Sequence, residues 1–385
     1  MSQRKRLLTF SVAGVLLVGV LTALALYPGL KSRWETPLGP GLELPTYTPA
    51  EPRPTGTELA ALVTNAQVST GLTQPAISDS PTVAPPSNTP TPRPFCGGPE
   101  VMTVLAVGAD SRQDTYLYGL ADVIRIVRVD FVTPKVTVLS MPRDLWVEIP
   151  GIADHHDITH GKLNQAYLYG GVGMGYYDGP GLGPGLLART LDLNFGLRVE
   201  HYGAVNMQTF VKIVDAVGGI DVYLPQAVDG RPIDDKTEDM GFFPAGQHHF
   251  TGDEALRFSR IRKKYNDFVR IDNQTTVLCA LKEKVTSPEV LPDVPKIIAA
   301  FQDNVLTDLS LAQLGQLACL VPRLKKENLI FTSIPEDILE PSRAFDPILD
   351  NTTFVWDVDF DLIRELVAEF QAGTWPDKPK EPSCP

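Results

Sequence analysis

A long uncharged segment near the start of the chain most constrains how this protein can fold. No charged residue occurs from Leu7 to Leu30, and about 20 apolar residues are enough for a helix to cross a bilayer core of roughly 30 Å. A cleaved signal peptide has a shorter apolar core and a small-residue cleavage site. A buried core helix fits poorly, because the segment shows no amphipathic pattern. Residues 7–27 are therefore predicted to form an uncleaved transmembrane helix.

Basic residues flank this segment on both sides. The cluster Arg4–Arg6 precedes it, and Lys31 and Arg33 follow it. The positive-inside rule favours a cytoplasmic N-terminus. We therefore expect a single-pass protein of the cell membrane, with residues 1–6 as a cytoplasmic tail and the remaining chain outside the cell.

Residues 28–95 are predicted to be an extracellular linker. From residue 36 onward this segment is rich in Pro, Thr and Ser, as in PTVAPPSNTPTPRP, and its apolar residues are too scattered to bury a core. Such a composition is typical of a semi-extended chain with polyproline II character. A structureless loop of this length is uncommon inside a compact domain.

The remaining part, about 290 residues from Cys96, is long enough to bury a sizeable core. Strands are predicted at 101–107 and 121–131, one or two strands within 135–149, and a short one at 201–207. Helices are predicted to begin at Lys162 and near Gly185, and to cover 267–285, 297–304, 311–320 and 359–371; Thr251 caps a further short helix. Alternating helices and strands imply an α/β sheet covered by helices. We divide this part into a main domain, 96–335, and a C-terminal extension, 336–385, with one helix and a loose tail.

The chain contains four cysteines and no CxxC pair, which argues against a tetrahedral zinc site. An exported domain permits disulfides. Of the three possible connectivities we favour Cys96–Cys384 with Cys279–Cys319, because the first bond would tie together the two ends of the folded part. Free buried thiols remain the alternative for the second pair.

The segment RFSRIRKKYNDFVRIDNQ, residues 257–274, concentrates positive charge in an acidic protein. It holds six Lys or Arg in a chain whose formal net charge is −12. Arg260 and Arg262 are two residues apart, so their side chains share a face if SRIRK is a strand. Guanidinium groups match phosphate oxygens well. The segment is either a solvated surface or the binding site of a strong anion.

Other charged residues follow predicted strands. Asp110 and Arg112 come after the first strand, Asp122 lies at the start of the second, and Arg143 follows the third. Mg²⁺ takes one or two carboxylates, keeps several waters and binds substrate phosphates directly. Two Asp with three or four Arg therefore predict a diphosphate-binding site. Singly, such residues are common in turns and surface ion pairs, so the prediction depends on their joint occurrence.

Several motifs together resemble the LytR-CpsA-Psr family. They are GADSR, ADVIRIVRVD, VTVLSMPRDLWVEIPG, KLNQAY with LYGG, FVKIVDAVGGIDVYLP, FPAGQHHFTGDEALRFSRIRKK and DFVRIDNQ. Their order and approximate spacing agree from about residue 100 to 285, and DNVLTDLSLAQLGQLA extends the likeness towards residue 335.

The resemblance implies a membrane-anchored phosphotransferase that acts outside the cell. Such enzymes move a glycopolymer, for example teichoic acid or capsular polysaccharide, from a polyprenyl pyrophosphate carrier to a peptidoglycan hydroxyl through a phosphodiester. The implied fold is a mixed central β-sheet sandwiched between helices, with an apolar pocket for the lipid tail. The implied catalytic domain covers 96–335, and the implied cofactor is Mg²⁺ or Mn²⁺.

The resemblance also implies roles for individual residues. Asp110 and Asp122 match the metal-binding carboxylates. By its own position and chemistry, Asp267 is a candidate general base, and the alternative is a plain aspartate at the start of a helix. Asn273 stands where the family usually has a second Arg, and Ala121 and Val123 stand where Ser or Thr is common. The implied phosphate-binding and neighbouring residues are Arg112, Arg143, Lys162, Asn164, Arg260, Arg262, Arg270 and Gln274.

Two other functions remain open at this point. One is a polyprenyl pyrophosphate phosphatase, in which water replaces the acceptor hydroxyl. The other is a non-enzymatic protein that binds lipid phosphate or glycan and regulates envelope processes. Nucleic acid is not expected as a partner, because the chain is acidic and predicted to be exported.

Overall fold

The computed structural model describes residues 34–45, 93–111, 115–235, 237–262, 264–301, 304–376 and 384. The predicted transmembrane helix, most of the predicted linker and Arg112 lie outside these ranges. Within them, no helix is both long and apolar enough to cross a membrane.

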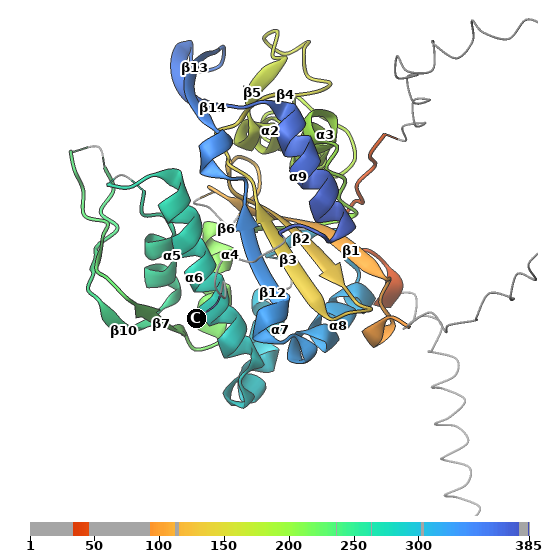
Figure 1. Cartoon of the computed structure of the whole chain (residues 1–385), viewed down its shortest axis with the longest axis vertical. Helices are drawn as coiled ribbons and strands as arrows, with labels where there is room; N and C mark the ends of the chain where they lie inside the picture. The colour runs from red at the N-terminus through yellow and green to blue at the C-terminus, as the bar shows by residue number, and fades with distance from the viewer. Residues whose placement is uncertain are drawn as a thin grey trace, which may run out of the picture. The chain divides into compact units, whose positions relative to one another are not determined.

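A mixed sheet forms the centre of the domain, as predicted (Figure 1). β6 is parallel to β1 and β12 is parallel to β3, whereas the other neighbouring pairs are antiparallel. The spatial order of its strands is β11 (Leu306–Thr307), β6 (His201–Asn206), β1 (Val101–Ala109), β2 (Ala121–Asp130), β3 (Lys135–Ser140) and β12 (Leu329–Ser333).

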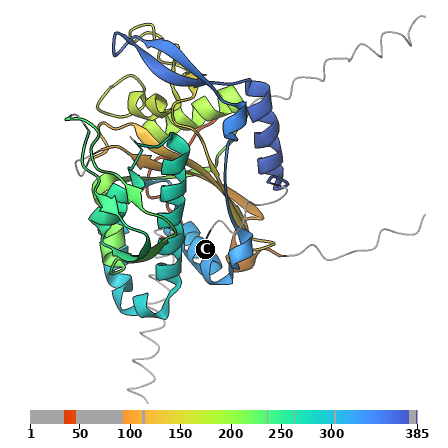
Figure 2. The same ribbon diagram turned by 60° about the vertical axis from the view of Figure 1, so that its left-hand side comes forward.

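Helices cover both faces of this sheet (Figure 2). One face packs its alternate residues, such as Leu105, Val107 and Ile126, into the largest apolar core. Because successive side chains of a strand point to opposite faces, the residues between them face the other layer. The first face is covered by α2 (Leu163–Tyr169), α3 (Leu182–Phe195) and α9 (Phe360–Ala372).

The second face carries the helices that surround the site described below. The helices of this layer are α4 (Met207–Ala216), α5 (Gly252–Ser259), α6 (Asp267–Thr286), α7 (Val294–Phe301) and α8 (Leu311–Leu320). Asn206 caps α4, Asn266 caps α6, and Thr251 caps α5 as predicted, forming a capping box with Glu254. A small sheet of β7 (Ile220–Leu224) and β10 (Gly246–Phe250) packs with α5 and α6 around a second apolar core.

The C-terminal extension contains more structure than the single predicted helix. A hairpin of β13 (Glu340–Asp346) and β14 (Asn351–Asp357) precedes α9 and was not predicted. The backbone N–H of Trp356 donates to the carbonyl oxygen of Asp144 at 2.9 Å, so the base of the hairpin joins the main domain.

Two further strand pairs are β4 (Trp146–Glu148) with β5 (His160–Lys162), and β8 (Val228–Asp229) with β9 (Phe242–Phe243).

The favoured disulfide connectivity is wrong. The structure pairs Cys96 with Cys319 and Cys279 with Cys384, with Cα–Cα distances of 5.9 and 5.3 Å. Cys96 lies in the short 3₁₀ helix η1 (Phe95–Gly97), which packs on α8, and Cys319 is on α8. Cys384 is buried beside Cys279 of α6 and Leu329. Packing of these segments therefore selects the partners, and the end of the predicted loose tail is attached to α6.

Residues 34–44, within the predicted linker, also pack against the domain. The N–H of Leu38 donates to the carbonyl oxygen of Leu309 at 3.3 Å, and the hydroxyl of Tyr202 donates to the carbonyl oxygen of Pro40 at 3.0 Å. Leu42 and Leu44 contact the main core. This short segment therefore lies along the edge formed by β11 and the start of α8.

Candidate functional site

A cavity of about 670 Å³ lies between the second face of the sheet and helices α4, α5 and α6. Its sheet wall is formed by small side chains, among them Ala106, Gly108 and Gly203. A Cβ atom added at Gly203 would meet no atom within 4 Å. The space stays open because the residues on this face are too small to fill it.

The two ends of the cavity differ in polarity. Carboxylates and guanidinium groups gather where β1 ends, whereas Phe301, Leu309 and Leu314 line the part contributed by α7 and α8. From Val104, which packs in the core next to Leu309, to Asp110 is six residues of strand, or roughly 20 Å. The cavity can therefore hold an elongated molecule with a charged head and an apolar tail.

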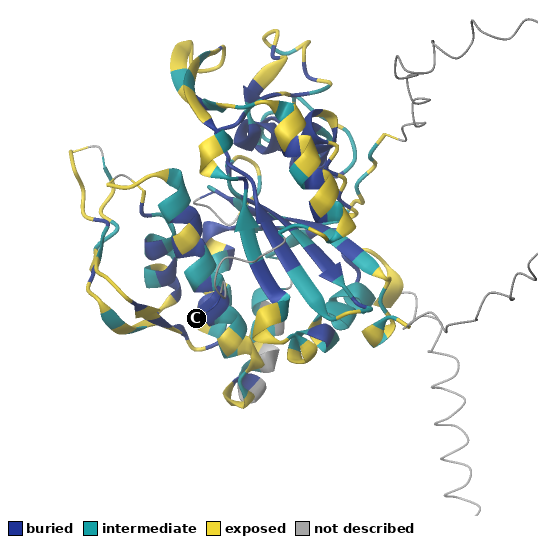
Figure 3. Ribbon diagram, viewed as in Figure 1, coloured by how far each residue is buried: buried dark blue, intermediate teal, exposed yellow. Residues whose placement is uncertain are grey.

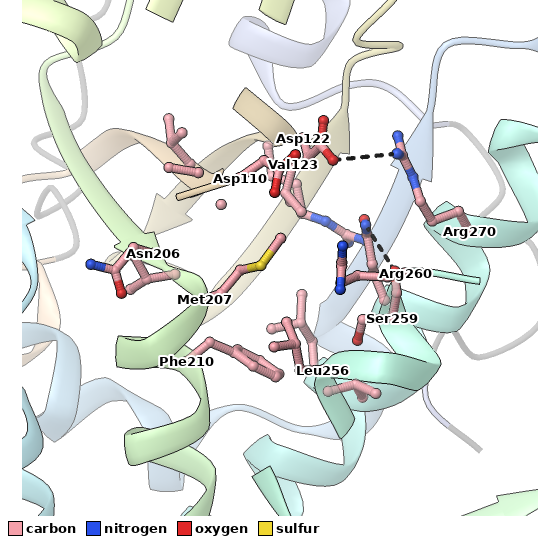
Figure 4. A pocket seen from close by; sticks show the side chains of 18 of the residues that line it. Asp110, Asp122, Val123, Asn206, Met207, Phe210, Leu256, Ser259, Arg260 and Arg270 are labelled. Atoms are coloured by element: carbon pink, nitrogen blue, oxygen red, sulfur yellow. Dashed lines mark hydrogen bonds and ion pairs between the residues drawn. The ribbon is translucent and has the colours of Figure 1, made fainter. Parts of the chain in front are cut away.

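Asp110 and Asp122 lie together at the charged end (Figure 4). Asp110 follows β1 and Asp122 is the second residue of β2. The backbone N–H groups of both residues donate to the carbonyl oxygen of Leu120, at 2.8 and 3.0 Å, and the strand register shifts between Gly108 and Ala109. Such irregularities often re-aim side chains next to active sites, and here both carboxylates line the same cavity.

These two carboxylates fit a magnesium ion. Among the described residues, no group of three or more His, Cys, Asp or Glu forms a metal site, so the protein would supply Asp110 and Asp122 alone. One or two carboxylates with water and phosphate oxygens is the ligand set that Mg²⁺ prefers. A magnesium ion at these two carboxylates stays a prediction.

The segment SRIRK is not a strand. Ser259 is the last residue of α5, Arg260 caps that helix at its C-terminus, and Arg262 follows in the loop to α6. Ile261 between them is buried in the second core. The condition under which the two arginines were expected to share a face is therefore not met, but both of them line the cavity.

The two arginines differ in their partners. Arg260 pairs with Glu238 at 3.0 Å. Arg262 is exposed and makes no ion pair with any residue within the described part of the chain. Arg262 is therefore the cation most readily available to an incoming anion, and Arg260 must exchange one carboxylate for another anion.

Arg143 lies behind Asp122 rather than in the cavity wall. One of its Nη atoms bonds to Asp122, while its Nε lies 3.3 Å from Asp144 and 3.8 Å from Asp267. Burial lowers the pKa of Arg143, but the three surrounding carboxylates outweigh this effect and raise the pKa above its usual value. Arg143 therefore remains charged and fixes the position of Asp122.

Asp267 and Arg270 form the next part of this charged network. They pair at 2.8 Å on the first turn of α6, and Arg270 also reaches Asp122 at 4.0 Å. Burial raises the pKa of Asp267, although Arg270 and Arg143 oppose this shift. Burial and the nearby Arg143 lower the pKa of Arg270. Arg270 lines the cavity, so the pair places a guanidinium beside the candidate metal ligands.

The other predicted residues surround this network. Lys162 pairs with Asp144 at 2.9 Å. The backbone N–H of Asn164 donates to the carbonyl oxygen of Arg143 at 3.0 Å, and its side chain is buried. Gln274 lines the cavity, and its amide lies 3.4 Å from the carbonyl oxygen of Ser259. The structure therefore brings together all the predicted residues except Arg112, which lies outside the described ranges.

Three further charged residues lie near the site: Asp144, which was noted after a strand but given no role, and Glu238 and Arg125, which were not predicted. Asp144 links Lys162 to Arg143, and Glu238 pairs with Arg260. Arg125 is buried and donates to the carbonyl oxygen of Ile271 at 3.1 Å, which ties β2 to α6. Burial lowers the pKa of Arg125 to about 10. Its position inside the apolar run VIRIV was a usable signal, because a charge in a buried strand needs partners.

The fold and this site define a mixed α/β protein with an elongated cavity that carries carboxylates and arginines at one end. The sequence matches the family model LytR_cpsA_psr over residues 86–369. The chain therefore belongs to the LytR-CpsA-Psr family, as its motifs indicate.

Two curated relatives illustrate the sequence similarity. The polyisoprenyl-teichoic acid–peptidoglycan teichoic acid transferase TagU of Bacillus cereus is 32% identical over 217 residues, which are 56% of this chain and 63% of that protein. The regulatory protein MsrR of Staphylococcus aureus is 29% identical over 210 residues, or 54% of this chain and 56% of that protein. The chain thus matches less than two thirds of the length of these relatives.

Solved structures support the fold. The crystal structure of B. subtilis TagV has a TM-score of 0.52 and 24% identity, covering 70% of this chain and 96% of that one. A structure of TagT bound to LIIa-WTA has a TM-score of 0.52 and 22% identity, covering 71% and 90%. At these identities the likeness concerns the fold alone.

Proposed function

We propose that this protein is a membrane-anchored extracellular phosphotransferase. It moves a glycopolymer from a polyprenyl (pyro)phosphate carrier to a hydroxyl of peptidoglycan or another envelope glycan. The single observation that carries this proposal is the cavity, which combines an apolar tail space with a charged head site. The relative TagU, named a teichoic acid transferase that acts on peptidoglycan, supports the same reaction class.

The apolar part of the cavity would hold the polyprenyl chain. Each buried CH₂ group contributes about 0.8 kcal/mol to binding, so a long isoprenoid supplies affinity without specific contacts. The wall of Ala106, Gly108 and Gly203 leaves the necessary width.

The charged end would hold the diphosphate. Arg262 and Arg260 would supply cations at its rim, and Arg270, which is already paired with Asp267, would donate hydrogen bonds deeper in the cavity. A Mg²⁺ or Mn²⁺ ion held by Asp110 and Asp122 would neutralise further phosphate charge. Arg143 and Asp267 contact these groups and keep them in position.

The proposed reaction forms one bond to phosphorus and breaks another. The acceptor hydroxyl oxygen bonds to the phosphorus nearer the sugar, and the bond from that phosphorus to the bridging oxygen breaks. The products are a glycopolymer–acceptor phosphodiester and polyprenyl phosphate, and the hydroxyl proton passes to a base. Asp267 is our candidate base, because it lies beside Arg270, which lines the cavity, and because burial raises the pKa of its carboxyl.

The proposed location is outside the cell. The apolar segment 7–27 would anchor the chain, and both disulfides suit an oxidising compartment. In a reducing compartment such bonds are rare.

The test uses the full chain in detergent with a polyprenyl diphosphate-linked oligosaccharide and Mg²⁺, with and without soluble peptidoglycan glycan strands. We expect an acceptor-dependent phosphodiester product that is lost in Asp110→Ala and Arg260→Ala. Release of inorganic phosphate regardless of acceptor would point instead to a phosphatase. Tight donor binding without turnover under any of these conditions would contradict the enzyme and leave a binding protein.

A further inference from the structure

One face of the β13–β14 hairpin carries exposed aromatic side chains. The strand register pairs Arg343 with Phe354, and Phe345 and Trp356 lie two residues further along the two strands on the same face. Phe345 is 58% exposed and Phe354 is 40% exposed. Figure 3 shows that much of the hairpin is exposed where it extends from the domain.

The aromatic row leads to the charged network. The rings of Phe354 and Trp356 are 5.0 Å apart, and those of Trp356 and Phe268 are 6.3 Å apart. Phe268 directly follows Asp267 on α6. The backbone of Trp356 is also bonded to Asp144, which pairs with Arg143. The row therefore begins beside the site and ends at the tip of the hairpin.

The opposite face of the hairpin is fixed to the domain. Val355 and Asp346 are buried, and Asp346 accepts a hydrogen bond from the Gln165 side chain at 2.6 Å. The same carboxylate accepts the N–H groups of Ile348 and Leu349 in the turn. The aromatic face is thus held outward by a buried contact with α2, and an apolar patch kept exposed in this way marks an interaction surface.

We propose that this aromatic face, formed by Phe345, Phe354, Trp356 and Phe268, binds the acceptor glycan strand. This inference rests on the proposed function and names the surface that delivers its acceptor. A pyranose ring has an apolar C–H face and a polar rim. Aromatic rings attract such C–H groups through the negative charge of their faces, while Arg343 lies on the same side for the polar rim. A glycan strand stacked along the aromatic row would reach the charged end of the cavity.

A glycan fits this surface better than a bilayer does. The hairpin joins the domain at the charged end, through Asp144 and Trp356. The segment 34–44, which closely follows the predicted transmembrane helix, is bonded to Leu309 at the apolar end, roughly 20 Å away along β1. The hairpin also exposes Asp350, and acidic groups are repelled by anionic lipid surfaces.

The test measures binding to soluble, peptide-free peptidoglycan glycan strands by the full chain in detergent. We expect the double variant Phe345→Ala/Phe354→Ala to bind these strands about tenfold more weakly or worse. The replacement Phe345→Tyr/Phe354→Tyr should retain binding, because it keeps the rings. Tyr223→Ala serves as the matched control, since Tyr223 is an aromatic on β7 that is 61% exposed.

Three results would overturn the proposal. The first is that the wild-type chain does not bind glycan, and the second is that the wild type and the Ala variant bind glycan with equal affinity. The third is that the Ala variant still binds glycan but no longer binds phosphatidylglycerol vesicles. Transfer of the glycopolymer is measured in a separate assay. In that assay the Ala variant should have a higher KM for the glycan strands. Hairpin-dependent glycan binding without any transfer would refute the proposed function and leave the glycan surface intact. Transfer by the Ala variant with an unchanged KM for the glycan would refute the glycan surface and leave the proposed function intact.

Discussion

Gly203 offers the sharpest test of the proposed lipid cavity. It lies in β6 opposite Ala106 and lines the cavity, and an added Cβ would meet no atom within 4 Å. A side chain at this position would therefore extend into the space of the lipid tail, and its Cβ atom would displace no protein atom. β-branched residues also favour strands more than glycine does, so the variants should fold.

The expected loss of affinity follows from the carbon atoms displaced. Each buried CH₂ contributes about 0.8 kcal/mol, and each 1.4 kcal/mol changes affinity about tenfold. Gly203→Ala, which adds one carbon, should weaken binding of a polyprenyl diphosphate about fourfold. Gly203→Val should weaken it about 50-fold, and Gly203→Ile about 200-fold.

Binding is measured by titrating the full chain with a fluorescent polyprenyl diphosphate-linked sugar, and unfolding temperature is measured in parallel. A donor with a methyl group in place of the lipid provides the control. From Asn206, at the charged end of β6, to Gly203 is about 10 Å, so this donor does not reach the substituted position. Equal binding of the long donor by all four proteins would refute the cavity as the lipid site. An equal loss of affinity for the long donor and the methyl donor would also refute the cavity as the lipid site.

Three further predictions concern the charged end. Arg143→Ala should lower the free energy of unfolding by about 3 kcal/mol, because it leaves buried carboxylates without a partner. Arg262→Ala should change the free energy of unfolding by less than about 0.5 kcal/mol yet weaken donor binding. Urea unfolding measures the first effect and donor titration the second. Glu238→Gln should tighten donor binding up to about fivefold, since it releases Arg260 from a half-exposed ion pair; weaker binding would contradict this. Because the pKa of Asp267 is raised, its carboxyl binds a proton more readily in the folded state than in the unfolded state. This carboxyl therefore stabilises the fold at a pH below its pKa in the unfolded state, and it loses that contribution as pH rises through its pKa in the folded state. The difference in unfolding free energy between wild type and Asp267→Asn should therefore fall over that interval in urea melts, and a constant difference would refute the shift.

The sequence predicts the regular elements well where periodicity and caps agree. The helices predicted over 267–285, 311–320 and 359–371 are observed at Asp267–Thr286, Leu311–Leu320 and Phe360–Ala372. The helix predicted over 297–304 begins three residues earlier, at Val294. The hairpin was missed because its strands EPSRAFD and NTTFVWD bury few residues, so they show no clear apolar alternation.

The site was predictable where charged side chains lie at the ends of strands. Asp110, Asp122 and Arg143 were found from this position, and the structure groups them. The partners Asp144 and Glu238 could not be assigned, because their ion pairs depend on which loops meet in space. The same reason explains the wrong disulfide pairing.

The network accounts for the concentration of arginines in an acidic protein. Arg143, Arg270 and Lys162 are paired with Asp122, Asp144 and Asp267, so these three cations are already neutralised by three anions. They orient the site, and they leave little net charge for a ligand. In the proposed function, attraction for a diphosphate would then come from Arg262, from Arg260 once it leaves Glu238, and from a cation between Asp110 and Asp122. A site built in this way would hold its carboxylates in fixed positions before the donor arrives, and it would stay nearly neutral until a metal ion and a diphosphate bind together.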